Sequence, residues 1–250
     1  AAMSEPKRTI SGPKTFLELQ CAIYIDPKNG DIYSLNNDTE RHMTVWGRDQ
    51  KGDQPPKWKL HTPMGSFGLA VDESTNEMLI TGQTENVVAA YSKTAREEDS
   101  PAWVLWGDKT LLADPHGIYV NAERSEIFVG NHGSWHYVEP GTTFLQEGSV
   151  PPELLGKVKS YTDLIRPLGP STGKFFLPSI NVYSRTANGD VAPVRVIQGP
   201  KTRLNVPLGI SFDGASNQIA VINAGDDSIL FFDITASGDV APVRVLKGLK

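Results

Sequence analysis

The amino-acid sequence contains an internal repeat of about 45 to 50 residues, visible four times, which limits the folds that the chain can adopt. Its clearest part aligns without gaps between residues 115–131 and 207–223, which share the pattern Pro-x-Gly-Ile and end on Ile-x-Val-x-Asn. Residues 66–82 form a third copy, and residues 22–36 form a fourth in which Ala22 stands in place of glycine. A tandem repeat of this length indicates a fold assembled from small similar units.

Each unit predicts four antiparallel strands. Two short alternating apolar stretches separated by a polar turn predict a strand pair. The second half of the unit repeats as well, because residues 180–196 match residues 229–245 around a Gly-Asp turn. The last strand carries proline near its start, which suits an outer edge strand because proline lacks an N–H. Four strands per unit are typical of β-propeller blades. A solenoid is the competing architecture, but its coils usually have shorter periods.

The sequence therefore predicts one all-β domain over residues 1–250, a β-propeller of four-stranded antiparallel blades. The four complete blades are expected at about 18–62, 63–110, 111–202 and 203–250. Residues 8–15 resemble residues 195–202, so residues 1–17 are predicted to hold the outer strand of a preceding blade. Because exposed strand edges are avoided, the simplest expectation is a part of a longer ring. A four-bladed ring with an extra edge strand and a ring completed by a second chain are the alternatives.

The third blade contains an insertion at residues 132–177, between its second and third strands. Connections this long are usually functional or disordered. We expect a partner-binding surface here, because exposed tryptophan is enriched in protein-binding anchors. The alternative is a loop that packs over one face of the ring. The residues predicted to contact a partner are Trp135, Tyr137, His132 and His136.

Three strings of residues resemble a known family. They are Pro-x-Gly-Ile-x-x-Asp at 207–213, Asn-x-Ile-x-Val-x-Asn at 217–223, and the tail Thr-Ala-x-Gly-Asp-Val-Ala-Pro-x-Arg-Val. Together they are similar to NHL-type repeats of bacterial propeller proteins, most strongly over residues 177–250. The resemblance implies a six-bladed ring, a periplasmic or extracellular location in a bacterium, and binding or scaffolding more often than catalysis.

The function expected from these observations is that of a non-enzymatic, exported scaffold that binds a protein or a surface. It would be a subunit of a larger extracellular assembly, with the missing blades in the same longer chain or in another chain. The alternative is a metal-dependent hydrolase or lyase, similar to propeller lactonases, with its site in the central channel. No catalytic residue is predicted, since no Gly-x-Ser-x-Gly turn occurs in the sequence.

No cofactor is predicted apart from a divalent metal, and histidines are the best candidates for its site. His116 lies where the chain enters an inner strand, and His132 and His136 follow the neighbouring strand. Imidazole is a common zinc ligand, so the three could share an ion if the insertion folds back. No carboxylate is clearly placed with them. The alternative is that they are loop histidines bonded to the backbone or to water.

Acidic residues recur at one position of the repeat, as Asp26, Asp72 and Asp213, with Asn121 in the third copy. Recurrence in every unit favours a structural role, the capping of a turn by the side chain. A ring of acids around Ca²⁺ is the alternative, which would need six to eight oxygens gathered in one place.

Composition argues against two classes of partner. The formal net charge is -5 and the Lys and Arg residues are scattered, so we expect no nucleic-acid binding. No apolar run approaches the roughly 18 residues that span a bilayer, so we expect no membrane insertion. Cys21 is the single cysteine, which excludes a disulfide within the chain.

Overall fold

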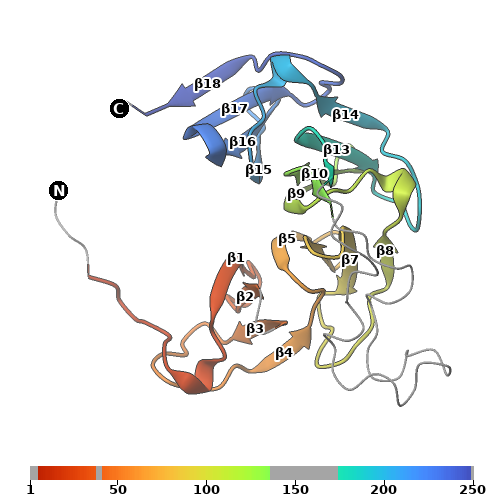
Figure 1. Ribbon diagram of the computed structural model, residues 1–250. Coiled ribbons are helices and arrows are strands. Elements are labelled where there is room, and N and C mark those ends of the chain that lie inside the picture. The colour runs from red at the N-terminus through yellow and green to blue at the C-terminus, as the bar shows by residue number, and fades with distance from the viewer. Residues whose placement is uncertain (1–4, 38–40, 136–173, 249–250) are drawn as a thin grey trace.

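The computed structural model describes residues 5–37, 41–135 and 174–248, and these form four blades arranged in an open arc (Figure 1). Each blade is an antiparallel sheet of four strands. The innermost strands are β1 (Leu19–Ile25), β5 (Ser66–Asp72), β9 (Pro115–Asn121) and β15 (Pro207–Asp213). The prediction of an all-β propeller with four-stranded antiparallel blades is confirmed.

The remaining strands of each blade follow outward in order. The first blade continues with β2 (Ile32–Asn37), β3 (His42–Trp46) and β4 (Trp58–His61), and the second with β6 (Glu77–Gly82), β7 (Val87–Ser92) and β8 (Trp103–Leu105). The third blade continues with β10 (Glu126–Asn131), β13 (Ser179–Ser184) and β14 (Arg195–Gln198), and the fourth with β16 (Gln218–Asn223), β17 (Ser228–Asp233) and β18 (Arg244–Lys247). Between β10 and β13 lies a small two-stranded sheet of β11 (Ser134–Trp135) and β12 (Lys174–Phe175).

The recurring acidic or amide residue at the end of each inner strand caps the turn that follows it. Asp26 Oδ1 accepts a hydrogen bond from the Lys28 amide at 2.7 Å, and Asp72 Oδ1 accepts one from the Ser74 amide at 2.9 Å. Asn121 and Asp213 make the corresponding bonds in the third and fourth blades. The predicted capping role is confirmed. Each side chain caps a turn of its own blade, and Asp26 and Asp72 also pair with a cation of the following blade, so turn capping and blade pairing account for the recurrence.

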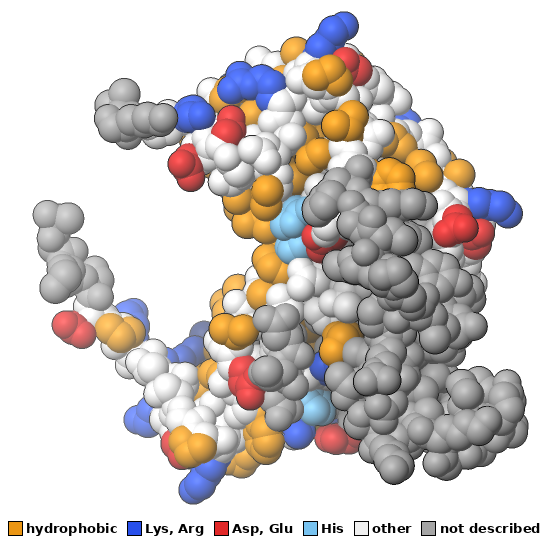
Figure 2. Space-filling view, in the orientation of Figure 1, with side chains coloured by type: hydrophobic (Ala, Val, Ile, Leu, Met, Phe, Trp, Pro, Cys, Tyr) orange, Lys and Arg blue, Asp and Glu red, His pale blue; other side chains and the backbone are white. Residues whose placement is uncertain are grey.

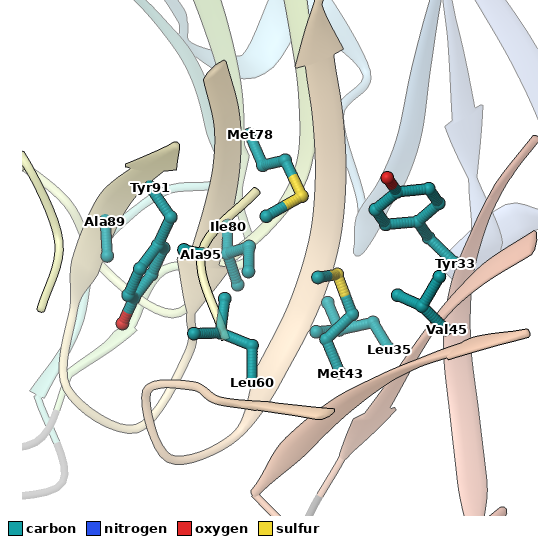
Figure 3. Close-up of a cluster of buried hydrophobic side chains, with 10 residues drawn as sticks. All are labelled: Tyr33, Leu35, Met43, Val45, Leu60, Met78, Ile80, Ala89, Tyr91 and Ala95. Carbon is teal, nitrogen blue, oxygen red and sulfur yellow. The ribbon is translucent and has the colours of Figure 1, made fainter. Parts of the chain in front are cut away.

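The hydrophobic core is divided among the interfaces between neighbouring blades. Between the first two blades, Leu35, Met43 and Leu60 meet Met78 and Ile80, as Figure 3 shows. Similar clusters fill the second and third interfaces. The second and third blades each have a neighbour on both faces. Their strands therefore carry apolar side chains on both faces, as expected for stacked sheets.

The blades are also joined at their outer rims by one repeated contact. The Lys109 amide at the end of the second blade donates to Asp190 Oδ1 of the third at 2.7 Å. The Lys201 amide and Asp239 repeat this bond between the third and fourth blades, also at 2.7 Å. Each lysine lies in a short 3-10 turn, so Gly-Asp-Lys-Thr at 107–110 and Gly-Pro-Lys-Thr at 199–202 form turns that connect blades.

The segment before the first blade makes the same contact. The Lys14 amide donates to Asp53 Oδ1 at 2.7 Å, and Ile10 pairs in parallel with Gly52. Leu105 and Ile197 pair in the same way with glycines of the blades that follow them. Residues 10–15 thus contact the first blade as the end of one blade contacts the next. Among the described residues, no helix has the length and hydropathy needed to cross a bilayer.

Candidate functional site

Three side chains able to bind a metal meet at the inner end of the third blade. His116 is the second residue of β9, Asp114 directly precedes that strand, and His132 follows β10. Pairing of Pro115 with Asn131 brings the two strand ends together. Asp114 has a φ of 56°, a left-handed conformation that turns the chain into β9. One ligand atom of each of the three side chains lies within 4.8 Å of the others.

The carboxylate faces the Nδ1 atoms of both imidazoles. His116 Nδ1 is 3.4 Å from Asp114 Oδ1, and His132 Nδ1 is 3.7 Å from Asp114 Oδ2. The two imidazole rings are stacked, with centroids 3.4 Å apart and planes inclined by 15°. Phe67 of β5 packs on His116 with a centroid distance of 4.2 Å. Figure 2 shows histidine side chains at the inner rim of the arc.

Burial keeps both histidines neutral at pH 7. It lowers the pKa of His116 and, together with the neighbouring His116, lowers the pKa of His132 to about 4, although Asp114 opposes both shifts. Neutral imidazole is the form that binds metals. His132 Nε2 is buried and has no hydrogen-bond partner among the described residues. The Ser134 hydroxyl donates to Asp114 Oδ2, which ties the carboxylate to the start of β11.

A carboxylate and two imidazoles are the donor set of Zn²⁺ and similar divalent ions, and three protein ligands leave one position open. An imidazole lone pair lies in the plane of its ring, whereas the two rings here lie face to face. Joint coordination of one ion therefore requires one ring to turn.

The predicted site residues are placed as follows. His116 and His132 come together, and the expectation that no carboxylate accompanies them is wrong, because Asp114 lies with both. Asp114 could have been proposed as a ligand from the sequence, because it lies two residues before His116. His136 and Tyr137 lie outside the described residues. Trp135 is in β11, where it pairs with Lys174 of β12.

A second surface of interest is the open face of the first blade. Ile23 and Ile25 of β1 are 68% and 60% exposed. At the same place in the third blade, Ile118 is only 7% exposed and Val120 packs against the interface cluster, because the second blade covers them. The inner strand of every blade carries apolar residues at these two positions, and only in the first blade are they left uncovered among the described residues.

The face of the fourth blade that points away from the third blade is also apolar and exposed. Leu246 of β18 is 60% exposed, whereas Ile197 at the same place in the third blade is 1% exposed because the fourth blade covers it. Ile222 of β16 is exposed on the same fourth-blade face. Hydrophobic side chains line the arc on both sides of its opening (Figure 2). The two end faces therefore carry the apolar pattern that is buried wherever one blade meets another.

Comparison with known proteins identifies the fold. No protein-family model matches the sequence, and no curated protein matches it. Among solved structures, a chain of the crystal structure of a nidogen/laminin complex is similar, with a TM-score of 0.57 and 15% sequence identity. The match covers 92% of this chain and 65% of that chain, so this chain spans somewhat less than two thirds of its length. At this identity the likeness shows that the chain has the β-propeller fold.

Proposed function

We propose that the protein is a binding scaffold whose open end faces bind further propeller blades. The observation that carries this proposal is the exposure of Ile23, Ile25 and Leu246 at positions that are covered at every internal blade interface. Exposed apolar faces of this kind mark binding surfaces. The similar propeller comes from a crystal structure of a complex, which is consistent with protein binding.

The finer form of the proposal follows the NHL-type resemblance. The completed ring would be six-bladed, the protein bacterial and exported to the periplasm or beyond, and the ring part of a larger extracellular assembly. The additional blades would belong to the same longer chain or to another chain. The apolar pattern of the two end faces supports further blades as the occupants, because it matches that of blades that pack on one another.

The proposal is tested by photo-crosslinking in the source organism. A benzophenone amino acid is placed at Ile25 in one variant and at Leu246 in another, with the exposed Lys51 position as control. We expect crosslinks from Ile25 and Leu246 to peptides with alternating apolar residues, identified by mass spectrometry, because the faces are covered by strands. Crosslinking at both sites no stronger than at Lys51 would contradict the proposal. Crosslinks to a second copy of this chain would replace it with self-association.

A second candidate function is divalent-metal binding, and the convergence of Asp114, His116 and His132 favours it. A bound ion with an open position could activate water, which is the chemistry that a propeller hydrolase or lyase would require. The neutral state of both imidazoles supports metal binding near pH 7.

Titration of chelator-treated protein with zinc chloride in a calorimeter tests this candidate. We expect one zinc ion per chain, with binding lost in Asp114→Asn and in His132→Ala because each removes one of three ligands. His61→Ala is the matched control, because it also removes one imidazole, but His61 pairs with Glu98 and is not part of the cluster. Equal zinc binding by all four proteins would exclude this site as the zinc ligand.

A further inference from the structure

A buried cation and acid join the first and second blades at one defined place. Lys93 Nζ of the second blade lies 2.9 Å from Asp26 Oδ2 of the first, and both side chains are almost completely buried. Lys93 also contacts Glu73 of its own blade. A buried charge is tolerated only with a partner, so each of these two blades must supply the charge that the other one needs.

The same arrangement joins the second and third blades. Arg185 Nε of the third blade donates to Asp72 Oδ2 of the second at 2.9 Å. The two cations occupy one position of the repeat, two residues after an aromatic residue of the third strand: Lys93 follows Tyr91, and Arg185 follows Tyr183.

The third interface has neither charge at these two positions. The residue two positions after Phe232 is Ile234, in place of a cation, and the facing inner-strand residue is Asn121, in place of an acid. Ile234 is buried in the cluster between the third and fourth blades. An aspartate at position 121 would be a buried charge without a partner, so the third interface is consistent with a pairing of these two positions of the repeat.

Both ends of the arc carry half of this pair. Arg48 is two residues after Trp46 of β3, so the first blade has a cation at this position. Arg48 is exposed and makes no ion pair with any residue that the structure describes. Asp213 is the acid at the end of β15, and its carboxylate is 3.4 Å from Arg244 of its own blade. No cation from a following blade reaches it among residues 5–37, 41–135 and 174–248.

Resting on the proposed binding of further blades, we propose that the occupants complete these two pairs. The blade that covers the fourth blade carries a lysine or arginine facing Asp213, two residues after the aromatic residue of its third strand. The sheet that covers the first blade carries an aspartate or glutamate facing Arg48, at the end of its inner strand.

A second copy of this chain would also match the charges, since its Arg48 could face Asp213. The contacts at the outer rim argue against it. Residues 10–15 already pair with Gly52 and Asp53, where the outer strand of a neighbouring blade would make its contacts. In a head-to-tail dimer, β18 of the second copy would have to make these same contacts with Gly52 and Asp53. The occupant of the first blade is therefore a sheet to which residues 10–15 supply the outer strand.

The test combines charge reversal with the crosslinker at Leu246. In the full protein from its source, Asp213→Lys is expected to lower the crosslinking yield about tenfold when the occupant is a second chain, because like charges across an interface repel. When the occupant belongs to the same chain, the unfolding midpoint falls instead, and it falls further than in Asp213→Ala, which loses the same turn-capping bond to the Ala215 amide without adding a positive charge. The control is Glu123→Lys, which makes the same change of charge at an exposed position of the third blade and should alter neither quantity.

The outcomes separate the two proposals. Sequencing of the crosslinked peptide shows directly whether a lysine or arginine follows the aromatic residue by two positions. Crosslinks that persist at full yield in Asp213→Lys, with an unfolding midpoint no lower than that of Asp213→Ala, would overturn the charge pairing and leave blade binding intact. The absence of any crosslink in the parent protein would instead overturn blade binding.

Discussion

Replacement of Lys93 by isoleucine is expected to lower the free energy of unfolding by about 3–5 kcal/mol, the usual cost of leaving a buried ion without its partner. Asp26 would keep the Lys28 amide but lose the cation that lies 2.9 Å away. Glu73 would be affected less, because Lys28 Nζ also lies 2.8 Å from its carboxylate. Urea unfolding of parent and variant at pH 7 measures the difference.

The double variant Asp26→Asn with Lys93→Ile should recover most of this loss, because it reproduces the Asn121 and Ile234 pairing of the third interface. Lys28→Ile is the control, since Lys28 reaches the same Glu73 carboxylate from an exposed position and should cost less than about 1 kcal/mol. A double variant as unstable as Lys93→Ile alone would show that the unpaired Asp26 carboxylate is not the source of the loss.

The deficit of Lys93→Ile should also depend on pH. Burial by itself raises the pKa of Asp26, but the Lys93 and Lys28 contacts outweigh it, so the carboxyl pKa lies below its usual value. In the parent, this contribution to stability is present above the unfolded pKa of about 4 and is lost as the pH falls through the lower folded pKa. Without Lys93 burial dominates and the folded pKa rises, so the deficit should shrink as the pH is lowered from 7 toward 4.

The second large effect is expected from Gly117→Ala on β9. A Cβ atom there would lie 1.7 Å from the Leu208 carbonyl oxygen of β15, a contact that only movement of one blade backbone could relieve. We expect a loss of about 3 kcal/mol, at the upper end of overpacking costs, because the obstacle is backbone and not a side chain that can turn. Thermal and urea unfolding measure the loss.

Gly209→Ala is the matched control at the same position of the fourth blade. Its nearest neighbour would be the end of the Ile222 side chain at 3.1 Å, which can shift, so the change should stay within about 1 kcal/mol. Equal losses in the two variants would show that the glycine is needed for strand conformation and not for the close approach of neighbouring blades.

Sequence and structure agree most closely on what is local and repeated. The alternating apolar residues, the polar turn and the edge proline each act within one blade, so four similar copies predict the strands and their order. The capping by Asp26 and Asp72 was predictable for the same reason, since each side chain bonds an amide two residues away.

The partners that join blades were not predictable in this way. Lys93 and Asp26, or Arg185 and Asp72, are far apart in the chain and meet because adjacent blades place equivalent positions side by side. Asp114 was missed beside His116 and His132, because a left-handed residue ahead of β9 turns its carboxylate toward both imidazoles. A single sequence shows residue types and local turns, but not which side chains of different blades face one another.

The repeat, the all-β class and the four-stranded blade can all be predicted from the amino-acid sequence, because hydrophobic periodicity and turn chemistry act over a few residues. Which blade faces are covered and which are open follows from the packing of the blades in three dimensions. Ile118 and Ile23 occupy the same place in the repeat, yet one is buried and the other is 68% exposed. The difference comes from the presence or absence of a neighbouring blade, and burial depends on what is packed against a residue.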